Sequence, residues 1–163
     1  MKGESAMSGP LGEPFVLRPG QGRAIDLGTF EMSVKASGEA TGAAFSLLEA
    51  AEPPNFEPPL HIHHNASEAF YVLEGEYIIF LGADEHTCPA GSFIFIPAGI
   101  RHGFRVGSTP SRKLNIYTPS AMVGYFDDLS VALKSGGADP DRLNEIAFRH
   151  GMEVIGPVPE GYL

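Results

Sequence analysis

Residues 59–75 read PLHIHHNASEAFYVLEG and place two histidines and a glutamate close together in the chain. Side chains on a β-strand alternate between its two faces, and each residue advances the strand by roughly 3.3 Å. His61 and His63 therefore project from the same face of a strand, with their backbones about 6.6 Å apart. Two imidazoles in this arrangement can converge on one metal ion.

Glu68 can join these histidines only if the chain turns after His63. It lies five positions further on, so an unbroken strand would direct it to the opposite face. Residues 65–67 are Asn, Ala and Ser, which supply that turn. The β-favouring residues 70–72 then predict a second strand, and Gly75 predicts its end.

A second segment supplies a fourth candidate ligand. Residues 91–104 read GSFIFIPAGIRHGF, an apolar strand followed by a turn with Pro and Gly and by a returning strand. On the returning strand His102 shares a face with Phe104 and Val106. The candidate metal ligands are therefore three imidazoles and one carboxylate.

Both segments resemble the two sequence motifs of the cupin family, G-x5-H-x-H-x4-E-x6-G and G-x5-P-x-G-x2-H-x3-N. The resemblance covers residues 55–106, about a third of the chain. Asn55 stands in place of the opening Gly and Val106 in place of the closing Asn, and neither position is a metal ligand in the family. The matching positions are His61, His63, Glu68 and Gly75 in the first motif and Gly91, Pro97, Gly99 and His102 in the second.

The resemblance implies an all-β fold, the double-stranded β-helix or jelly-roll barrel of a small single-domain, quercetinase-like cupin. Twenty glycines, fourteen prolines and no tryptophan suit many short strands joined by tight turns. With 163 residues the chain can form one domain with its own core. We expect a flexible N-terminal lead-in over residues 1–14, a cupin β-barrel over 15–119 and a helical C-terminal extension over 120–163 packed on the barrel.

Other segments predict further strands. Apolar and polar residues alternate over residues 30–35, as in a strand with one face toward solvent. Residues 77–81 are apolar on both faces, which indicates either a subunit contact in a homodimer or a buried inner strand. Residues 84–91 are interpreted as a turn region.

After Pro119 the apolar residues recur every three or four positions, which predicts two amphipathic helices. Asp139 can cap the second helix and Pro140 fits its first turn. We expect both helices to cover the outside of the barrel, and the tail over residues 154–163 either to lie over a barrel mouth or to dock on the surface. The predicted apolar stripes are Met122, Phe126, Leu129 and Leu133, then Leu143, Ile146 and Ala147.

Charge and composition disfavour several classes of partner. A net charge of −9 repels nucleic acids and anionic membrane surfaces. Cys88 is the only cysteine, so no intrachain disulfide forms. No apolar run approaches the ~18 residues of a membrane span, and the N-terminus lacks the apolar core of a signal peptide. We expect a cytoplasmic protein with a small-molecule partner.

The ligand set suits one divalent transition metal, Fe, Mn, Ni, Cu or Zn, and argues against calcium. These donors do not select among the five metals. An ion that prefers six ligands would have two positions left for water, substrate or dioxygen. Open positions distinguish catalytic from structural sites.

Strand parity directs Phe70, Val72, Phe104 and Val106 inward near the ligands, so we predict that they bind the substrate. They form an apolar, partly aromatic surface. Neither Lys nor Arg falls on these positions, which counts against a substrate with a phosphate group. A small apolar or aromatic substrate that bears an oxygen is expected.

The cupin resemblance implies related chemistry. The family includes quercetinase-like dioxygenases, in which the three histidines and the glutamate of the motifs hold the metal and the glutamate can act on a substrate proton. Glu68 is therefore predicted to be a ligand and a catalytic base. The leading hypothesis is a metal-dependent dioxygenase, and the alternatives are a non-catalytic cupin that binds a small molecule or a metal, and a metal-assisted isomerase.

Overall fold

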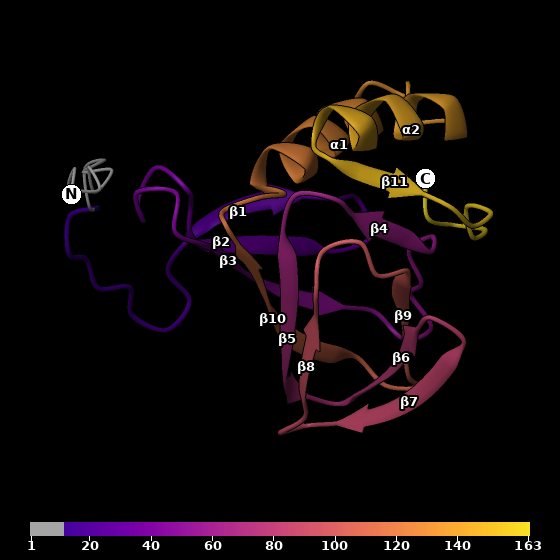
Figure 1. The fold of residues 1–163 in the computed structure, drawn as a ribbon, viewed down its shortest axis with the longest axis horizontal. Coiled ribbons are helices and arrows are strands. Elements are labelled where there is room, and N and C mark those ends of the chain that lie inside the picture. The colour runs from indigo at the N-terminus through magenta and orange to yellow at the C-terminus, as the bar shows by residue number, and fades with distance from the viewer. Residues whose placement is uncertain (1–11) are drawn as a thin grey trace, which may run out of the picture.

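The computed structural model describes residues 12–163, which form two antiparallel β-sheets and two C-terminal helices (Figure 1). The all-β fold with two short helices that was expected from the sequence is confirmed. Most of the expected lead-in over residues 1–14 lies outside the described residues. Neither helix in residues 12–163 has the length and apolar character needed to cross a membrane.

The first sheet has the strand order β1-β2-β3-β10-β5-β8, and the second has the order β11-β4-β9-β6-β7. From β3 to β10 the chain passes repeatedly from one sheet to the other. The two sheets therefore face each other and form one barrel. The strands of the first sheet are β1 (Arg23–Asp26), β2 (Glu31–Ala36), β3 (Ser46–Glu52), β5 (Ser67–Glu74), β8 (Phe93–Ile96) and β10 (Ser111–Thr118). Those of the second are β4 (His61–His63), β6 (Glu76–Leu81), β7 (Asp84–Pro89), β9 (His102–Val106) and β11 (Met152–Val154).

The core between the sheets follows from the alternation of side chains along the strands. In β10 every second residue from Ser111 to Tyr117 is buried, and in β5 the buried positions are Glu68, Phe70 and Val72. Fully burying one large apolar side chain contributes about 1.5–3 kcal/mol. The inner cluster of the barrel consists of Phe70, Val72, Tyr77, Ile79, Ile94, Ile96, Phe104 and Val106.

Two segments of the second sheet bear on expectations from the sequence, residues 77–81 and residues 84–91. β6 pairs with β9 on one side and β7 on the other, so residues 77–81 form an inner strand of the sheet. The interpretation of residues 84–91 as a turn region was wrong for Asp84–Pro89, which is β7. This strand lies at the edge of its sheet and is largely exposed, so its polar residues show no apolar alternation.

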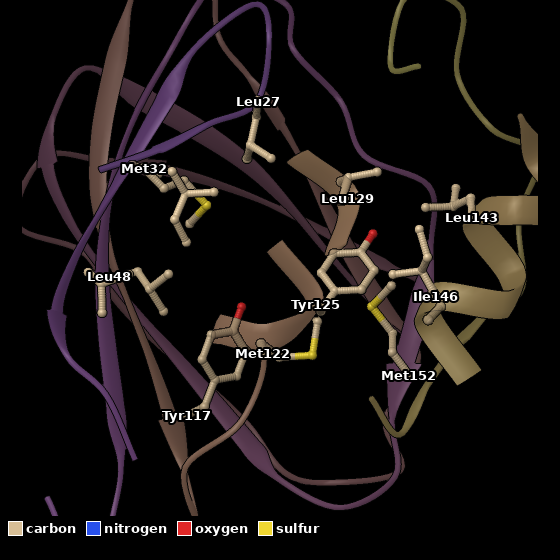
Figure 2. Close-up of a cluster of buried hydrophobic side chains, with 14 of the residues drawn as sticks. Leu27, Met32, Leu48, Tyr117, Met122, Tyr125, Leu129, Leu143, Ile146 and Met152 are labelled. Carbon is tan, nitrogen blue, oxygen red and sulfur yellow. The ribbon is translucent and has the colours of Figure 1, made fainter. Parts of the chain in front are cut away.

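The helices are α1 (Val123–Lys134) and α2 (Pro140–Arg149), close to where the apolar spacing predicts them. The Asp139 side chain caps α2 by accepting a hydrogen bond from the backbone N–H of Arg142 at 2.8 Å. The expectation that both helices cover the outside of the barrel was wrong for α1. It lies across one end of the barrel, where Tyr125 and Leu129 join the same apolar cluster as the strand residues Met32 and Leu48 (Figure 2).

The C-terminal segment also completes the second sheet. β11 pairs with β4, so the three-residue strand β4 has a partner on each side. The backbone N–H groups of Ile155 and Gly156 then donate to the carbonyl of Leu60 at 2.9 and 3.3 Å. Tyr162 lines the cavity inside the barrel, so of the two alternatives for the tail the structure has the one at the barrel mouth.

Candidate metal centre

Three short strands bring the four predicted ligands together. β4 carries His61 and His63 on its buried face, β5 carries Glu68 on its second residue, and β9 begins with His102. His61 and His102 are directly opposite each other in the β4–β9 pair. The four side chains are only 1% to 8% exposed, so the group is enclosed by protein.

The ligand atoms of these four residues all lie within 4.8 Å of one another. Glu68 is central, because its Oε2 atom is 2.8 Å from Nε2 of His102 and 3.0 Å from Nε2 of His63. The rings of His61 and His102 are also close, with centroids 4.4 Å apart. This arrangement can hold one metal ion.

Backbone carbonyl groups orient two of the imidazoles. Nδ1 of His61 is 2.8 Å from the carbonyl oxygen of Pro59, and Nδ1 of His102 is 2.8 Å from that of Ile100. An Nδ1–H group that donates to a carbonyl leaves Nε2 as the atom available to a metal. Both rings thus present the same nitrogen to the centre of the group.

The residues fit a divalent metal ion. Nε2 of His63 is buried and has no hydrogen-bond partner among residues 12–163, although it lies beside the carboxylate of Glu68. Buried polar atoms normally have a hydrogen-bond partner. A buried nitrogen that lacks one and faces three other potential metal-ligand atoms therefore indicates a metal ligand. Three neutral imidazoles and a carboxylate suit the divalent transition metals.

Mutual interactions set the protonation of the metal-free group. Burial, together with the neighbouring His102 and His63, lowers the pKa of His61 to about 3. Burial opposes ionisation of Glu68, but His63 and His102 outweigh it and hold the pKa of this carboxyl well below its usual range. Burial likewise opposes a proton on His102, yet the hydrogen bond to Glu68 raises its pKa. His102 therefore keeps a proton more readily than His61.

We expect the affinity for metal to fall as the pH is lowered. Above the raised pKa of His102 this imidazole has no extra proton to lose, so its titration does not change the affinity. Below that pKa a metal ion must displace the proton, and the affinity should fall about tenfold per pH unit for each proton displaced. His61, with a pKa of about 3, stays neutral through this range.

Zinc affinity measured by competition with a chromophoric chelator from about pH 5.5 to 8 would check this expectation. Calorimetry in buffers of different ionisation enthalpy would count the protons released. A constant zinc affinity over this range, with no proton release at its acidic end, would contradict the assignment of His102 as a ligand.

A cavity of about 60 Å³ adjoins the metal-binding group. One water molecule needs roughly 10–15 Å³ of such space, so the cavity accommodates a small ligand. Its wall includes Met32 and Phe56 from the first part of the chain, Met122 and Leu129 at the end closed by α1, and Tyr162 from the tail. The lining is mostly apolar.

The structure divides the four residues predicted to contact substrate into two pairs. Phe70 and Phe104 line the cavity. Val72 and Val106 do not, because both are completely buried in the inner cluster of the barrel. Strand parity predicts that a side chain points inward, but it does not predict its depth along the barrel.

A buried ion pair was not predicted from the sequence. Lys113 is fully buried, and its Nζ lies 3.1 Å from both carboxylate oxygens of Glu52. The hydroxyl of Tyr77 donates to Glu52 at 2.7 Å, and Lys113 Nζ lies 4.3 Å from the centre of the Phe104 ring. The alternation in residues 111–117 was the available signal, because it puts Lys113 on the same face as Tyr117. Since Glu52 neutralises it, this lysine offers no free charge to a phosphate.

Comparison with known proteins gives the family. Residues 49–117 match the family described as "Cupin domain". An RmlC-like cupin from Shewanella frigidimarina NCIMB 400 has the same fold, with a TM-score of 0.56, 18% identity and coverage of 66% of this chain and 92% of the other. KdgF from Halomonas sp. gives a TM-score of 0.54 and 14% identity over 60% of this chain and 86% of that one. The chain is a cupin with the double-stranded β-helix fold.

A curated relative extends the comparison. The chain is 30% identical over 112 residues to quercetin 2,3-dioxygenase of Bacillus subtilis (strain 168). The similar region is 69% of this chain and 33% of that protein, so the chain spans about a third of the relative's length. The resemblance to quercetinase-like cupins thus extends over 112 residues, beyond the two motifs.

Proposed function

We propose that this cupin is a metal-dependent dioxygenase that acts on a small apolar or aromatic substrate bearing an oxygen. The observation that carries the proposal is a buried group of three imidazoles and one carboxylate that faces a mostly apolar cavity. Four protein ligands leave positions open on an ion that prefers six. The similarity to quercetin 2,3-dioxygenase supports the same reaction class.

The side chains have separate roles in this proposal. His61, His63, His102 and Glu68 would hold a redox-active divalent metal, which supplies the reaction with dioxygen when bound. Glu68 is ionised in the metal-free group, so its carboxylate is available as a ligand. In this proposal it also accepts a proton from a substrate hydroxyl. Phe70 and the other apolar walls would bind the flat faces of the substrate and exclude water.

Tyr117 would help to orient the Glu68 carboxylate that accepts the substrate proton. It is buried and lies opposite Glu68 in the β5–β10 pair. Burial and the neighbouring Glu68 carboxylate raise the pKa of Tyr117 well above its usual value, so its hydroxyl stays protonated. A protonated hydroxyl beside an ionised carboxylate can donate a hydrogen bond to it and orient its free lone pairs.

Oxygen consumption tests the proposal. The metal-free protein would be loaded separately with Fe(II), Mn(II), Ni(II) and Cu(II), and each form would be mixed with flavonols, β-diketones and catechols in an oxygen-electrode cell. We expect at least one pair of metal and substrate to consume oxygen, and we expect His63→Ala to abolish that consumption. His64→Ala is the matched control, because His64 is exposed and pairs with Glu153 at 2.7 Å.

Oxygen consumption that is absent from the whole panel would count against a dioxygenase. If compounds of the same panel then raised the melting temperature of the metal-loaded protein without forming product, the non-catalytic binding cupin would be favoured. Conversion of a compound to an isomer without uptake of oxygen would favour the metal-assisted isomerase.

A further inference from the structure

Asn115, in the wall of the cavity, has a buried and unsatisfied hydrogen-bond acceptor. The side chain is 4% exposed, and its Oδ1 atom has no hydrogen-bond partner among residues 12–163. Asn115 lines the same cavity as His61, His63 and Glu68. A buried acceptor without a partner is unfavourable unless something that the cavity binds supplies a donor.

The register of the sheet gives the depth of this acceptor. In the β5–β10 pair Tyr117 is opposite Glu68, and Asn115 is opposite Phe70. Asn115 is therefore one inward position away from the row that carries the metal ligand Glu68. Two residues of an antiparallel strand span about 6.8 Å. A molecule with a single ring, bound to the metal through an oxygen on one side, would carry a substituent on its other side at this depth.

The second carboxylate of the cavity is also an acceptor. Glu52 lines the cavity, and its carboxylate already receives the Tyr77 hydroxyl and the Lys113 ammonium. Tyr77 makes one of these contacts and Lys113 makes two. A carboxylate has about four lone-pair sites, so one site remains. Lys113 is held by Glu52 and by the surrounding rings and is not among the lining residues. Asn115 Oδ1 and the Glu52 carboxylate can therefore each accept a hydrogen bond from a ligand.

We propose that Asn115 is a specificity-determining residue, an inference that rests on the function proposed above. It selects single-ring substrates that carry a hydroxyl group on the side of the ring away from the metal-binding oxygen. A hydroxyl donates to Asn115 Oδ1, while an analogue with a methyl group in its place leaves that oxygen buried and unpaired. Sites that hydrogen-bond a substrate hydroxyl discriminate strongly against analogues that lack it.

Kojic acid and allomaltol are suitable probes for this inference. Both can bind a metal through the same hydroxyketone, and they differ only in a hydroxymethyl or a methyl group on the opposite side of the ring. Zinc-loaded protein would be used, because zinc is not redox-active and the probes would bind without being oxidised. Calorimetry would give the two dissociation constants.

We expect the wild-type protein to bind kojic acid at least about tenfold more tightly than allomaltol. In Asn115→Ala the two affinities should become equal, with the affinity for allomaltol nearly unchanged. Asn115→Asp retains an acceptor at the same position and should retain the preference. Zinc content and melting temperature would verify that each variant folds and holds the metal.

The outcomes separate this inference from the proposed function. Equal affinities for the two probes in the wild-type protein, or a preference that survives in Asn115→Ala, would overturn the role of Asn115 and leave the metal-dependent reaction standing. If neither probe binds the zinc-loaded protein, both the role of Asn115 and the proposed substrate site at the metal are overturned.

Discussion

His102→Ala is expected to lower the metal content of the protein from nearly one ion per chain to less than about a tenth of that value. Loss even of groups that only orient a ligand typically costs 10–100-fold in affinity. Loss of a ligand itself should cost at least as much, because His102 lies opposite His61 and within 2.8 Å of Glu68. The measurement is elemental analysis of protein purified without a metal-affinity column.

His64→Ala is the control for this experiment. It removes an imidazole one residue from His63, but this imidazole is exposed and paired with Glu153. Its metal content should equal that of the wild type. Full occupancy in His102→Ala would show that the four buried side chains do not act as one site. The metal found in the wild type also bears on the reaction, because iron, copper, nickel or manganese would favour the oxygenase and zinc a non-redox function.

Lys113→Met is expected to lower the free energy of unfolding of the metal-free protein by about 3–5 kcal/mol. The substitution keeps most of the volume of the side chain but leaves Glu52 buried without its cation. Removal of one partner from a buried ion pair is costly because the remaining charge has no compensation. Urea denaturation followed by circular dichroism would measure the change.

Arg112→Met provides the matched comparison on the same strand. Arg112 lies on the other face of β10, where it pairs with Glu49 and Glu74 at the surface. Partly exposed pairs contribute little, so this change should cost less than about 1 kcal/mol.

The double variant Lys113→Met/Glu52→Gln, which removes both buried charges, should recover most of the stability lost in Lys113→Met. An equal loss in Lys113→Met and Arg112→Met would contradict the importance of the buried pair. So would a double variant no more stable than Lys113→Met.

Three of the four candidate metal ligands could be predicted from a local spacing, and His102 could be predicted from the resemblance of its segment to the second cupin motif. Alternation along a strand puts His61 and His63 on one face, and the turn after His63 brings Glu68 back to them. The helices were predictable for the same reason, since the stripe through Leu129 and the cap at Asp139 each lie within a few residues of sequence.

Depth and neighbourhood within the barrel were not predictable in this way. Phe70 and Val72 have the same parity, but only Phe70 reaches the cavity. β7 was missed because an exposed edge strand needs no apolar alternation, and β11 because three residues are too few to show a period. These features depend on which segments pack against each other.

The sequence by itself determined the class of fold, the four side chains of the metal-binding group and the faces from which they project. The faces follow from the period of a strand and from turn residues, which act over a few positions. The class of fold and the inclusion of His102 follow from the resemblance of the two motifs to those of cupins. Only the tertiary structure decided that α1 and Tyr162 close the cavity, that Glu52 neutralises Lys113 and that Asn115 has an unpaired oxygen one row from Glu68. Each of these depends on contacts between segments far apart in the chain, and local spacing carries no information about them.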